Sequence, residues 1–234
     1  MNAARAFGLI LAVALPWLAP AAARAQLSGM VGAASDYRLR GSSLTDGRGA
    51  LSLGANYDHP SGAYAGATAI GHDPGGRGPR VLGYQAYAGV AGRFPGGPGW
   101  DVGVSRVDMR PYFDREYSID YSQAYVGLSQ GPVSGRLSLA PDYPRHGAVT
   151  AYAELNAVAR PADGWRLTSH AGALTRLDDG AASDGRTRYD VAVGVVRELG
   201  RAEASLTWVA VSPRPGPRTT WTRPGLVAGL AVFF

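Results

Sequence analysis

The last ten residues, Gly225-Leu226-Val227-Ala228-Gly229-Leu230-Ala231-Val232-Phe233-Phe234, are apolar on one alternation, small on the other, and end on an aromatic. Chain ends of soluble proteins are usually exposed and frayed, so two terminal phenylalanines suit them poorly. They suit the closing strand of a membrane β-barrel, whose alternate residues face lipid and whose ends carry interfacial aromatics. The alternative is a buried C-terminal strand of a soluble sandwich. The barrel reading predicts that Leu226, Ala228, Leu230, Val232 and Phe234 face outward and Val227, Gly229, Ala231 and Phe233 inward.

The composition favours a turn-rich β fold and excludes several functions. The chain has 234 residues, with 33 Gly and 16 Pro but only 18% charged residues. Cysteine is absent, which excludes disulfides and cysteine-based metal sites or nucleophiles. All 23 basic residues are Arg. The net charge of +5 falls to +3 without Arg5 and Arg24 of the leader, which is too mild to indicate nucleic-acid binding.

Residues 1–25 have the pattern of a secretory signal peptide. Arg5 supplies the positive start, an apolar run follows from Phe7 to Leu18, and Ala23-Arg24-Ala25 provides an Ala-x-Ala cleavage site. A membrane anchor is the alternative, but the run is short and Pro16 interrupts it. No later segment has the apolar length of a helical span. We therefore expect export with cleavage after Ala25, and a barrel in residues 26–234 if the protein resides in a membrane.

After Gln26 the sequence repeats a unit of about ten alternating residues followed by a turn, the length that crosses a bilayer as a tilted strand. The pattern predicts an all-β, transmembrane, antiparallel up-and-down barrel of about twelve strands. The expected strands are 27–38, 49–58, 63–72, 80–93, 100–110, 118–129, 133–142, 148–159, 165–175, 187–198, 202–211 and 224–234.

The connections alternate between tight turns and mostly longer, polar loops, which is the outer-membrane pattern and places both termini at the periplasm. The alternation predicts that charge is confined to one face of the strands, and a bulge near Arg106 is expected to correct the phase of the fifth strand. The expected turns are 59–62, 95–99, 130–132, 161–164 and 199–201, and the loops are 39–48, 73–79, 111–117, 142–147, 176–186 and 212–223. Aromatics expected at the membrane interfaces are Tyr57, Trp100, Trp165, Tyr189 and Trp221.

The segment Ser35-Asp36-Tyr37-Arg38-Leu39-Arg40-Gly41, followed by Thr45-Asp46-Gly47, resembles the start of the Gcw_chp group of exported proteobacterial proteins, also described as TorF-type porins. Leu39 replaces the usual aromatic. Pro141-Asp142-Tyr143 and Asp163-Gly164-Trp165 lie where similar family segments occur. The resemblance covers the mature chain, although only the first motif is specific. It implies an outer-membrane barrel of pore type and offers no catalytic residues.

Asp36, Arg38 and Arg40 share one alternation, so this mouth motif is expected to project into the lumen near the extracellular mouth. Gly41 and the Thr45-Asp46-Gly47 turn would then shape the first loop. A salt-bridge cluster that rigidifies the mouth is favoured over a dedicated ligand site.

No catalytic motif is present, and the sequence predicts no enzyme, metal or cofactor. His170 points inward beside Arg166, but no Ser can be placed within its reach, and there is no Gly-x-Ser-x-Gly or His-Glu-x-x-His pattern. Asp178-Asp179 is too weak a signal for calcium. Gly75-Gly76-Arg77-Gly78 lacks the strand–helix setting of a phosphate loop.

The predicted function is a narrow porin for passive diffusion of small polar solutes or ions. The first alternative is a sealed structural or surface-binding barrel, and the less favoured one is a barrel-embedded hydrolase. Expected partners are outer-membrane lipid and lipopolysaccharide, the barrel-assembly machinery through the C-terminal strand ending at Phe234, and small polar solutes. The predicted pore-lining residues are Arg136, Glu154, Arg166, His170, Arg188, Asp190 and Glu203.

Overall fold

The computed structural model describes residues 26–73, 78, 80–110, 118–143, 148–177, 187–212 and 222–234. The predicted signal peptide, most of five predicted loops, His146 and Trp221 lie outside them, as do Asp178, Asp179 and residues 75–77. Within the described residues, twelve strands form a closed antiparallel barrel. They are β1 (Gln26–Ala34), β4 (Ala50–Asp58), β5 (Ala63–His72), β6 (Arg80–Arg93), β7 (Gly99–Met109), β8 (Ile119–Gln130), β9 (Val133–Ala140), β10 (Thr150–Ala162), β11 (Trp165–Arg176), β12 (Arg188–Leu199), β13 (Ala202–Val211) and β14 (Gly225–Phe233).

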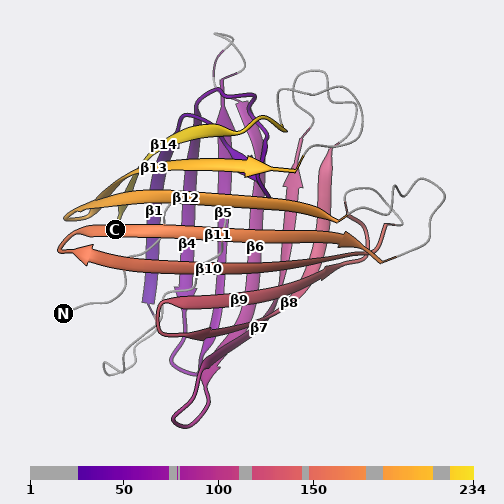
Figure 1. Cartoon of the computed structure of the whole chain (residues 1–234), viewed down its shortest axis with the longest axis vertical. Coiled ribbons are helices and arrows are strands. Elements are labelled where there is room, and N and C mark those ends of the chain that lie inside the picture. Colours follow the sequence, from indigo (N-terminus) through magenta and orange to yellow (C-terminus); the bar gives the residue numbers. More distant parts are fainter. Residues whose placement is uncertain are drawn as a thin grey trace.

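Each strand pairs with its neighbours in the chain, and β1 closes the barrel by pairing with both β4 and β14. In Figure 1, β10 to β13 cross over β1, β4, β5 and β6, as opposite walls of a barrel with tilted strands do. Gln26 and Phe233 lie at the end of the barrel that carries the short turns, which we call the turn end. The opposite end is the loop end.

The barrel and its strand spacing follow the sequence pattern closely, and the predicted fold class is confirmed. The bounds of β5, β6 and β13 are those predicted. The first strand was predicted wrongly, because β1 ends at Ala34 and not at residue 38. From Ser35 the chain leaves the wall and turns into the lumen, and it returns to the wall at Ala50, the residue paired with Ala34.

The outer surface is apolar, as a lipid-facing wall requires. Leu53, Val193 and Leu226 expose between 59% and 65% of their surface. In β14 the predicted faces are confirmed: Leu226, Ala228, Leu230 and Val232 are exposed, and the residues between them are buried or half-buried. Among the expected interfacial aromatics, Tyr57, Trp165 and Tyr189 are exposed near strand ends and Trp100 is half-buried.

No helix in the described ranges is long and apolar enough to cross a membrane.

The expected bulge near Arg106 is absent, because β7 pairs with β6 and β8 without a register shift. Arg106 therefore lies on the outer face, where its Nη2 is 2.8 Å from Asp120 Oδ2. Charge is thus not confined to the inner face. The ion pair lies near the loop end of the wall, where polar groups are less costly than at the bilayer midplane.

One irregularity in the wall lies between β5 and β6. Ile70 pairs with Gly83 and Gly71 with Val81, so Leu82 is the extra residue of a β-bulge. The bulge turns Leu82 inward, where only 1% of its surface is exposed. The outward position is taken by Val81, which is 61% exposed.

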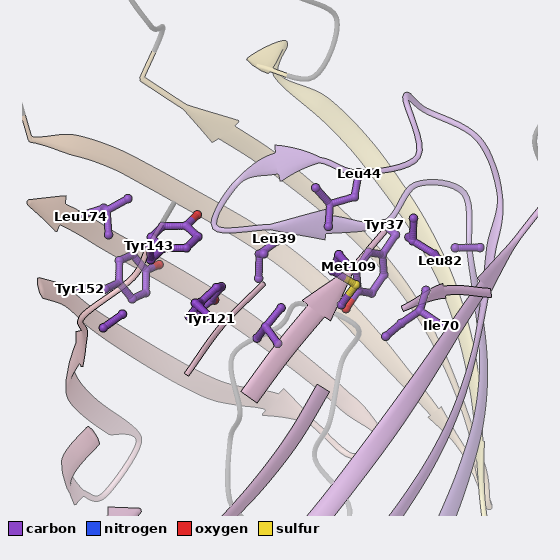
Figure 2. Packing of buried hydrophobic residues seen from close by; sticks show 13 residues of the cluster. Tyr37, Leu39, Leu44, Ile70, Leu82, Met109, Tyr121, Tyr143, Tyr152 and Leu174 are labelled. Carbon is purple, nitrogen blue, oxygen red and sulfur yellow. The ribbon is translucent and has the colours of Figure 1, made fainter. Parts of the chain in front are cut away.

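Inside the barrel, β2 (Arg38–Leu39) and β3 (Ser42–Ser43) form a small hairpin. Its two turn residues, Arg40 and Gly41, have φ angles of 48° and 75°, as a type I′ turn requires. Figure 2 shows the hairpin between side chains of the surrounding wall, with Tyr121 and Tyr152 toward one side and Ile70 and Leu82 toward the other.

The barrel dimensions explain why so short a hairpin occupies the lumen. Twelve strands spaced about 4.8 Å apart and tilted by about 40° close into a barrel of roughly 24 Å backbone diameter. A ribbon packed between two walls needs two face-to-face sheet spacings of about 10 Å, roughly 20 Å in all. The hairpin therefore acts as a third layer across the barrel.

Candidate functional site

Residues 35–49, which include the hairpin, form what we call the plug, and Asp36 organises it. The Asp36 carboxylate accepts hydrogen bonds from Ser43 Oγ (2.6 Å), Thr45 Oγ1 (2.9 Å) and the Gly47 amide (3.3 Å), and pairs with Arg38 Nε at 2.7 Å. It is 5% exposed. The favoured sequence reading, an internal salt-bridge cluster, is what the structure contains. Asp36 and Arg38 form an ion pair inside the plug, and they do not line the mouth as residues of an alternating strand.

The plug is also attached to the barrel wall. A Cβ placed on Gly41 would lie 2.8 Å from Asp190 Cβ and 2.9 Å from Val211 Cβ, so the hairpin tip touches β12 and β13. A larger residue would push the tip away from the wall. Side-chain hydrogen bonds also join the plug to the rest of the barrel, among them Arg38 Nη1 to the Arg223 carbonyl (2.9 Å), Arg188 Nη2 to Ser42 Oγ (3.3 Å) and Gln85 Nε2 to the Tyr37 hydroxyl (3.3 Å).

Apolar packing completes the plug. Tyr37, Leu39 and Leu44 are each no more than 5% exposed and belong to one buried cluster with residues of eight wall strands (Figure 2). The wall members on strands are Ala50, Ile70, Leu82, Val107, Met109, Tyr121, Ala140, Tyr152 and Leu174. Burying a leucine contributes about 1.5–3 kcal/mol, so the plug is an integral part of the folded barrel.

Arg40, at the hairpin tip, reaches into a group of tyrosines. Its guanidinium carbon lies 4.2 Å from the ring centroid of Tyr152, 4.5 Å from that of Tyr143 and 5.2 Å from that of Tyr121. Arg40 Nη2 donates to Gln123 Oε1 at 2.7 Å. Burial lowers the pKa of the Arg40 guanidinium, but the three tyrosines and the Glu154 carboxylate outweigh it and raise that pKa above its usual value. Arg40 is therefore charged at any working pH.

We expect Asp36→Asn to lower the free energy of unfolding by about 1.5–3 kcal/mol, because it removes a buried charge-assisted bond to Arg38. Asp46→Asn, an exposed carboxylate of the same segment, is the matched control and should change the free energy by less than about 0.5 kcal/mol. Urea unfolding of the protein refolded in detergent measures both. Equal effects of the two substitutions would contradict the organising role of Asp36.

Below the plug, His170 belongs to a polar cluster of four side chains. Its Nδ1 lies 2.8 Å from Asn156 Oδ1, and its Nε2 lies 2.8 Å from Asp190 Oδ1 and 3.1 Å from the Tyr152 hydroxyl. The Tyr152 hydroxyl also donates to Asp190 at 3.1 Å. Arg166, expected beside His170 from the sequence, instead interacts with acidic residues nearer the turn end.

Arg166 is the largest fully buried side chain of the barrel, with 1% of its surface exposed. Its Nη1 and Nη2 contact the two Glu203 oxygens at 3.1 and 2.6 Å in a bidentate pair. Nη1 also bonds Glu198. Because β12 and β13 are joined by the tight turn at the turn end, Glu198 and Glu203 are directly paired across the two strands. Both carboxylates therefore converge on Arg166 of β11.

A third polar cluster lies on the opposite side of the lumen. Asp101 Oδ2 pairs with Arg136 Nη2 at 3.0 Å and accepts from the Tyr64 hydroxyl at 3.2 Å. Tyr64 and Tyr125 share a hydrogen bond of 2.8 Å, and the Arg136 guanidinium carbon lies 4.4 Å from the Tyr125 ring centroid. Arg136 was predicted to line the lumen, but Tyr64 and Tyr125 were not named as candidates, although they also lie on inward alternations.

All seven predicted pore-lining residues lie on inward alternations, but each interacts with other side chains. Arg136 pairs with Asp101, Arg166 with Glu203, and His170 with Asp190. Arg188 donates a hydrogen bond to Ser42 of the plug, and Glu154 interacts electrostatically with the Arg40 guanidinium. Two cavities adjoin the plug tip. One, of about 30 Å³, is lined by Arg40, His170 and Asp190, and the other, of about 50 Å³, by Arg40, Gln123 and Glu154.

The described residues hold no group of three or more His, Cys, Asp or Glu side chains suited to a metal ion. His59 lies in a tight turn, as expected, and His72 is buried at the end of β5 with Nδ1 2.7 Å from the Gly49 carbonyl.

The motif that forms the plug is the segment whose resemblance pointed to one family in the sequence. A comparison with known families matches residues 19–219 to the family described as "Bacterial protein of unknown function (Gcw_chp)". The chain belongs to the Gcw_chp family. A comparison with curated proteins gives no match. The motif residues of this Gcw_chp barrel, Ser35 to Gly41 and Thr45 to Gly47, are those of the plug.

The Gcw_chp barrel is similar to several solved outer-membrane proteins. A loop-deletion mutant of OmpT of Vibrio cholerae is 8% identical, with a TM-score of 0.37, covering 92% of this chain and 100% of that one. The channel DcaP of Acinetobacter baumannii is 11% identical, with a TM-score of 0.39 and coverage of 91% and 97%. An anion-selective porin from Comamonas acidovorans is 12% identical, with a TM-score of 0.27 and coverage of 90% and 98%. Similarity at this level carries no function over to the Gcw_chp barrel.

Proposed function

We propose that the protein is a narrow outer-membrane channel for passive diffusion of small polar solutes or ions, and that the plug holds its lumen closed or nearly closed in the present conformation. The observation that carries the proposal is the polarity of the inner wall beside the hairpin tip and from there toward the turn end. Arg136, Arg166, His170, Asp190 and Glu203 all lie inside the barrel.

The buried charges favour a lumen that admits water over a lumen that is filled only by packed side chains. Taking ion pairs out of water usually costs more than their attraction returns, so a barrel selected only for stability gains by replacing them with apolar residues. Charged side chains inside barrels also set the ion selectivity of a water-filled passage. The acidic Glu198–Glu203 pair and the basic Arg166 lie near the turn end, where such a passage would open.

A sealed barrel that binds at its surface is the second candidate. The buried cluster around Tyr37, Leu39 and Leu44 favours it, because apolar side chains pack across the lumen at that level. The two candidates differ in one respect: the channel requires that the plug moves or loosens, and the sealed barrel requires that it stays.

We assign no catalytic role to His170. Both of its ring nitrogens already have hydrogen-bond partners in Asn156 and Asp190. A hydrolase mechanism needs one nitrogen facing the nucleophile and the other facing the orienting acid. The described geometry offers no free nitrogen to a serine.

The proposed location is the bacterial outer membrane, after removal of residues 1–25. The turn end would face the periplasm and the loop end the exterior. Proposed contacts are lipid and lipopolysaccharide on the outer wall, and the barrel-assembly machinery at β14. Phe234 supports the last of these, because its side chain is 65% exposed beside the seam, where its backbone pairs with Gly29.

Conductance of the refolded mature protein in a planar bilayer tests the channel directly. For the native protein we expect current steps that are brief or small, because the passage is narrow. We also expect a non-zero reversal potential in a salt gradient, because the passage is charged. Arg136→Gln should shift the reversal potential toward cation selectivity, and Asp142→Asn, a carboxylate just beyond the end of β9, is the control. A folded, heat-modifiable barrel that never conducts would leave the sealed barrel as the better account.

A further inference from the structure

The surroundings of Arg40 are those of a site built for an organic cation. Tyr121 comes from β8, Tyr143 from the segment after β9, and Tyr152 from β10, and the three rings surround one guanidinium at 4.2–5.2 Å. Aromatic cages with this arrangement recognise cationic groups through the negative faces of the rings. The Glu154 carboxyl group lines the cavity beside Arg40 and adds an acidic side chain to the site.

Arg40 itself is an incomplete occupant of this cage. Its Nη2 bonds Gln123, but its Nη1 is buried without a hydrogen-bond partner in the part of the chain that the structure describes. A buried donor without a partner costs about 1–3 kcal/mol. The adjoining cavity of about 50 Å³, lined by Gln123, Arg136, Tyr152 and Glu154, leaves space beside the guanidinium. A free ligand with additional polar atoms could satisfy the site more completely than Arg40 does.

We propose that Tyr121, Tyr143, Tyr152 and Glu154 form a binding site for small organic cations that carry a guanidinium or alkylammonium group, and that Arg40 occupies this site as an internal ligand. The inference rests on the proposed channel, since it names the solute class that the lumen admits. A solute that takes the place of Arg40 releases the tip of the plug from the Tyr cage. Binding of the solute and loosening of the plug are therefore the same event.

The test empties the cage and refills it. Arg40→Gly removes the side chain and suits the backbone, because φ at this position is 48°. The probe is n-propylguanidinium, which has the atoms of the missing side chain, and n-propylurea is the uncharged control. Calorimetric titration of the refolded full chain in detergent should give saturable binding of n-propylguanidinium to Arg40→Gly. Its Kd should be at least about tenfold lower than for the native protein, where the tethered Arg40 competes at a high effective concentration.

Two further variants assign the binding to the cage. Tyr152→Leu in the Arg40→Gly background should weaken binding of the probe by about tenfold, and Glu154→Gln should do so by a similar factor. Arg40→Asn, which also tolerates positive φ, replaces Arg40→Gly if the latter does not show the heat-modifiable migration of a folded barrel. No saturable binding to a folded Arg40 variant, or equal binding of n-propylurea, would overturn the proposal.

Binding is measured without any current, so the two proposals fail separately. A variant that binds n-propylguanidinium in a barrel that never conducts keeps the cation site and removes the channel. A barrel that conducts but whose Arg40→Gly variant does not bind the probe removes the cation site and keeps the channel.

Discussion

Replacement of residues 35–49 by a two-residue Asn-Gly turn should raise the single-channel conductance by roughly tenfold or more, because it removes the layer that packs across the lumen. Ala34 and Ala50 are directly paired between β1 and β4, so a tight turn can join them and leave the wall unchanged. With side-chain layers of about 5 Å on each wall, a barrel of roughly 24 Å would keep a passage of about 14 Å.

The replacement also removes apolar packing, so its folding has to be checked by heat-modifiable migration before conductance is read. Leu137→Ala, a substitution of an exposed residue on the outer wall, is a matched control that should leave conductance unchanged. If the replaced barrel folds and its conductance equals that of the native protein, then the plug is not what limits the passage.

Arg166→Met should lower the free energy of unfolding by about 3–5 kcal/mol, the usual cost of leaving a buried charge without its partner. Most of the lost stability comes from Glu203, which is 5% exposed, makes both contacts of the bidentate pair and would be left as an unpaired buried carboxylate. Glu198 is 34% exposed in its side chain and can turn to water, so it should contribute less. Urea unfolding in detergent micelles measures the change.

Adding Glu203→Gln to Arg166→Met should recover much of that stability, because it removes the uncompensated charge. Arg197→Met is the matched control, since Arg197 lies near the same end of β12 but its guanidinium lies over the Trp165 ring and donates to the Asp163 carbonyl. It should cost no more than about 1 kcal/mol. A double variant as unstable as Arg166→Met alone would show that packing, and not charge, determines the effect.

The barrel could be predicted from the sequence because strand alternation is a local signal. The alternation of apolar and polar or small residues within each strand predicts which of its faces meets lipid. The clearest case is β14, where Leu226 and Leu230 point outward and Val227 points inward. Tight turns such as His59–Gly62 supplied the connections. The phase of the strand around Arg106 was predicted wrongly, because an ion pair with Asp120 on the outer face has the same residue types as one inside.

The plug could not be predicted, because the motif that forms it also alternates. Asp36, Arg38 and Arg40 have the spacing of one strand face, and nothing local shows that the chain has left the wall. A local signal of the hairpin was present in Arg40-Gly41, a polar residue before glycine, as type I′ turns prefer. The partners of Arg40, by contrast, lie more than 80 residues away, in β8 and beyond, and only the closed barrel brings them together.

Cross-linking of the plug to the wall tests the central claim, that residues 35–49 lie inside the barrel, most directly. The native chain has no cysteine, so Gly41→Cys with Val211→Cys introduces the only two thiols. An ideal Cβ on residue 41 lies 2.9 Å from Val211 Cβ, and a disulfide needs about 3.8 Å, so a hairpin shift of about 1 Å suffices. Ala210→Cys in place of Val211→Cys points outward and is the control. We expect a disulfide in the folded barrel for the 41–211 pair and none for the 41–210 pair. A folded barrel in which neither pair cross-links, and the thiol at position 41 reacts fully with an impermeant maleimide, would contradict the plug.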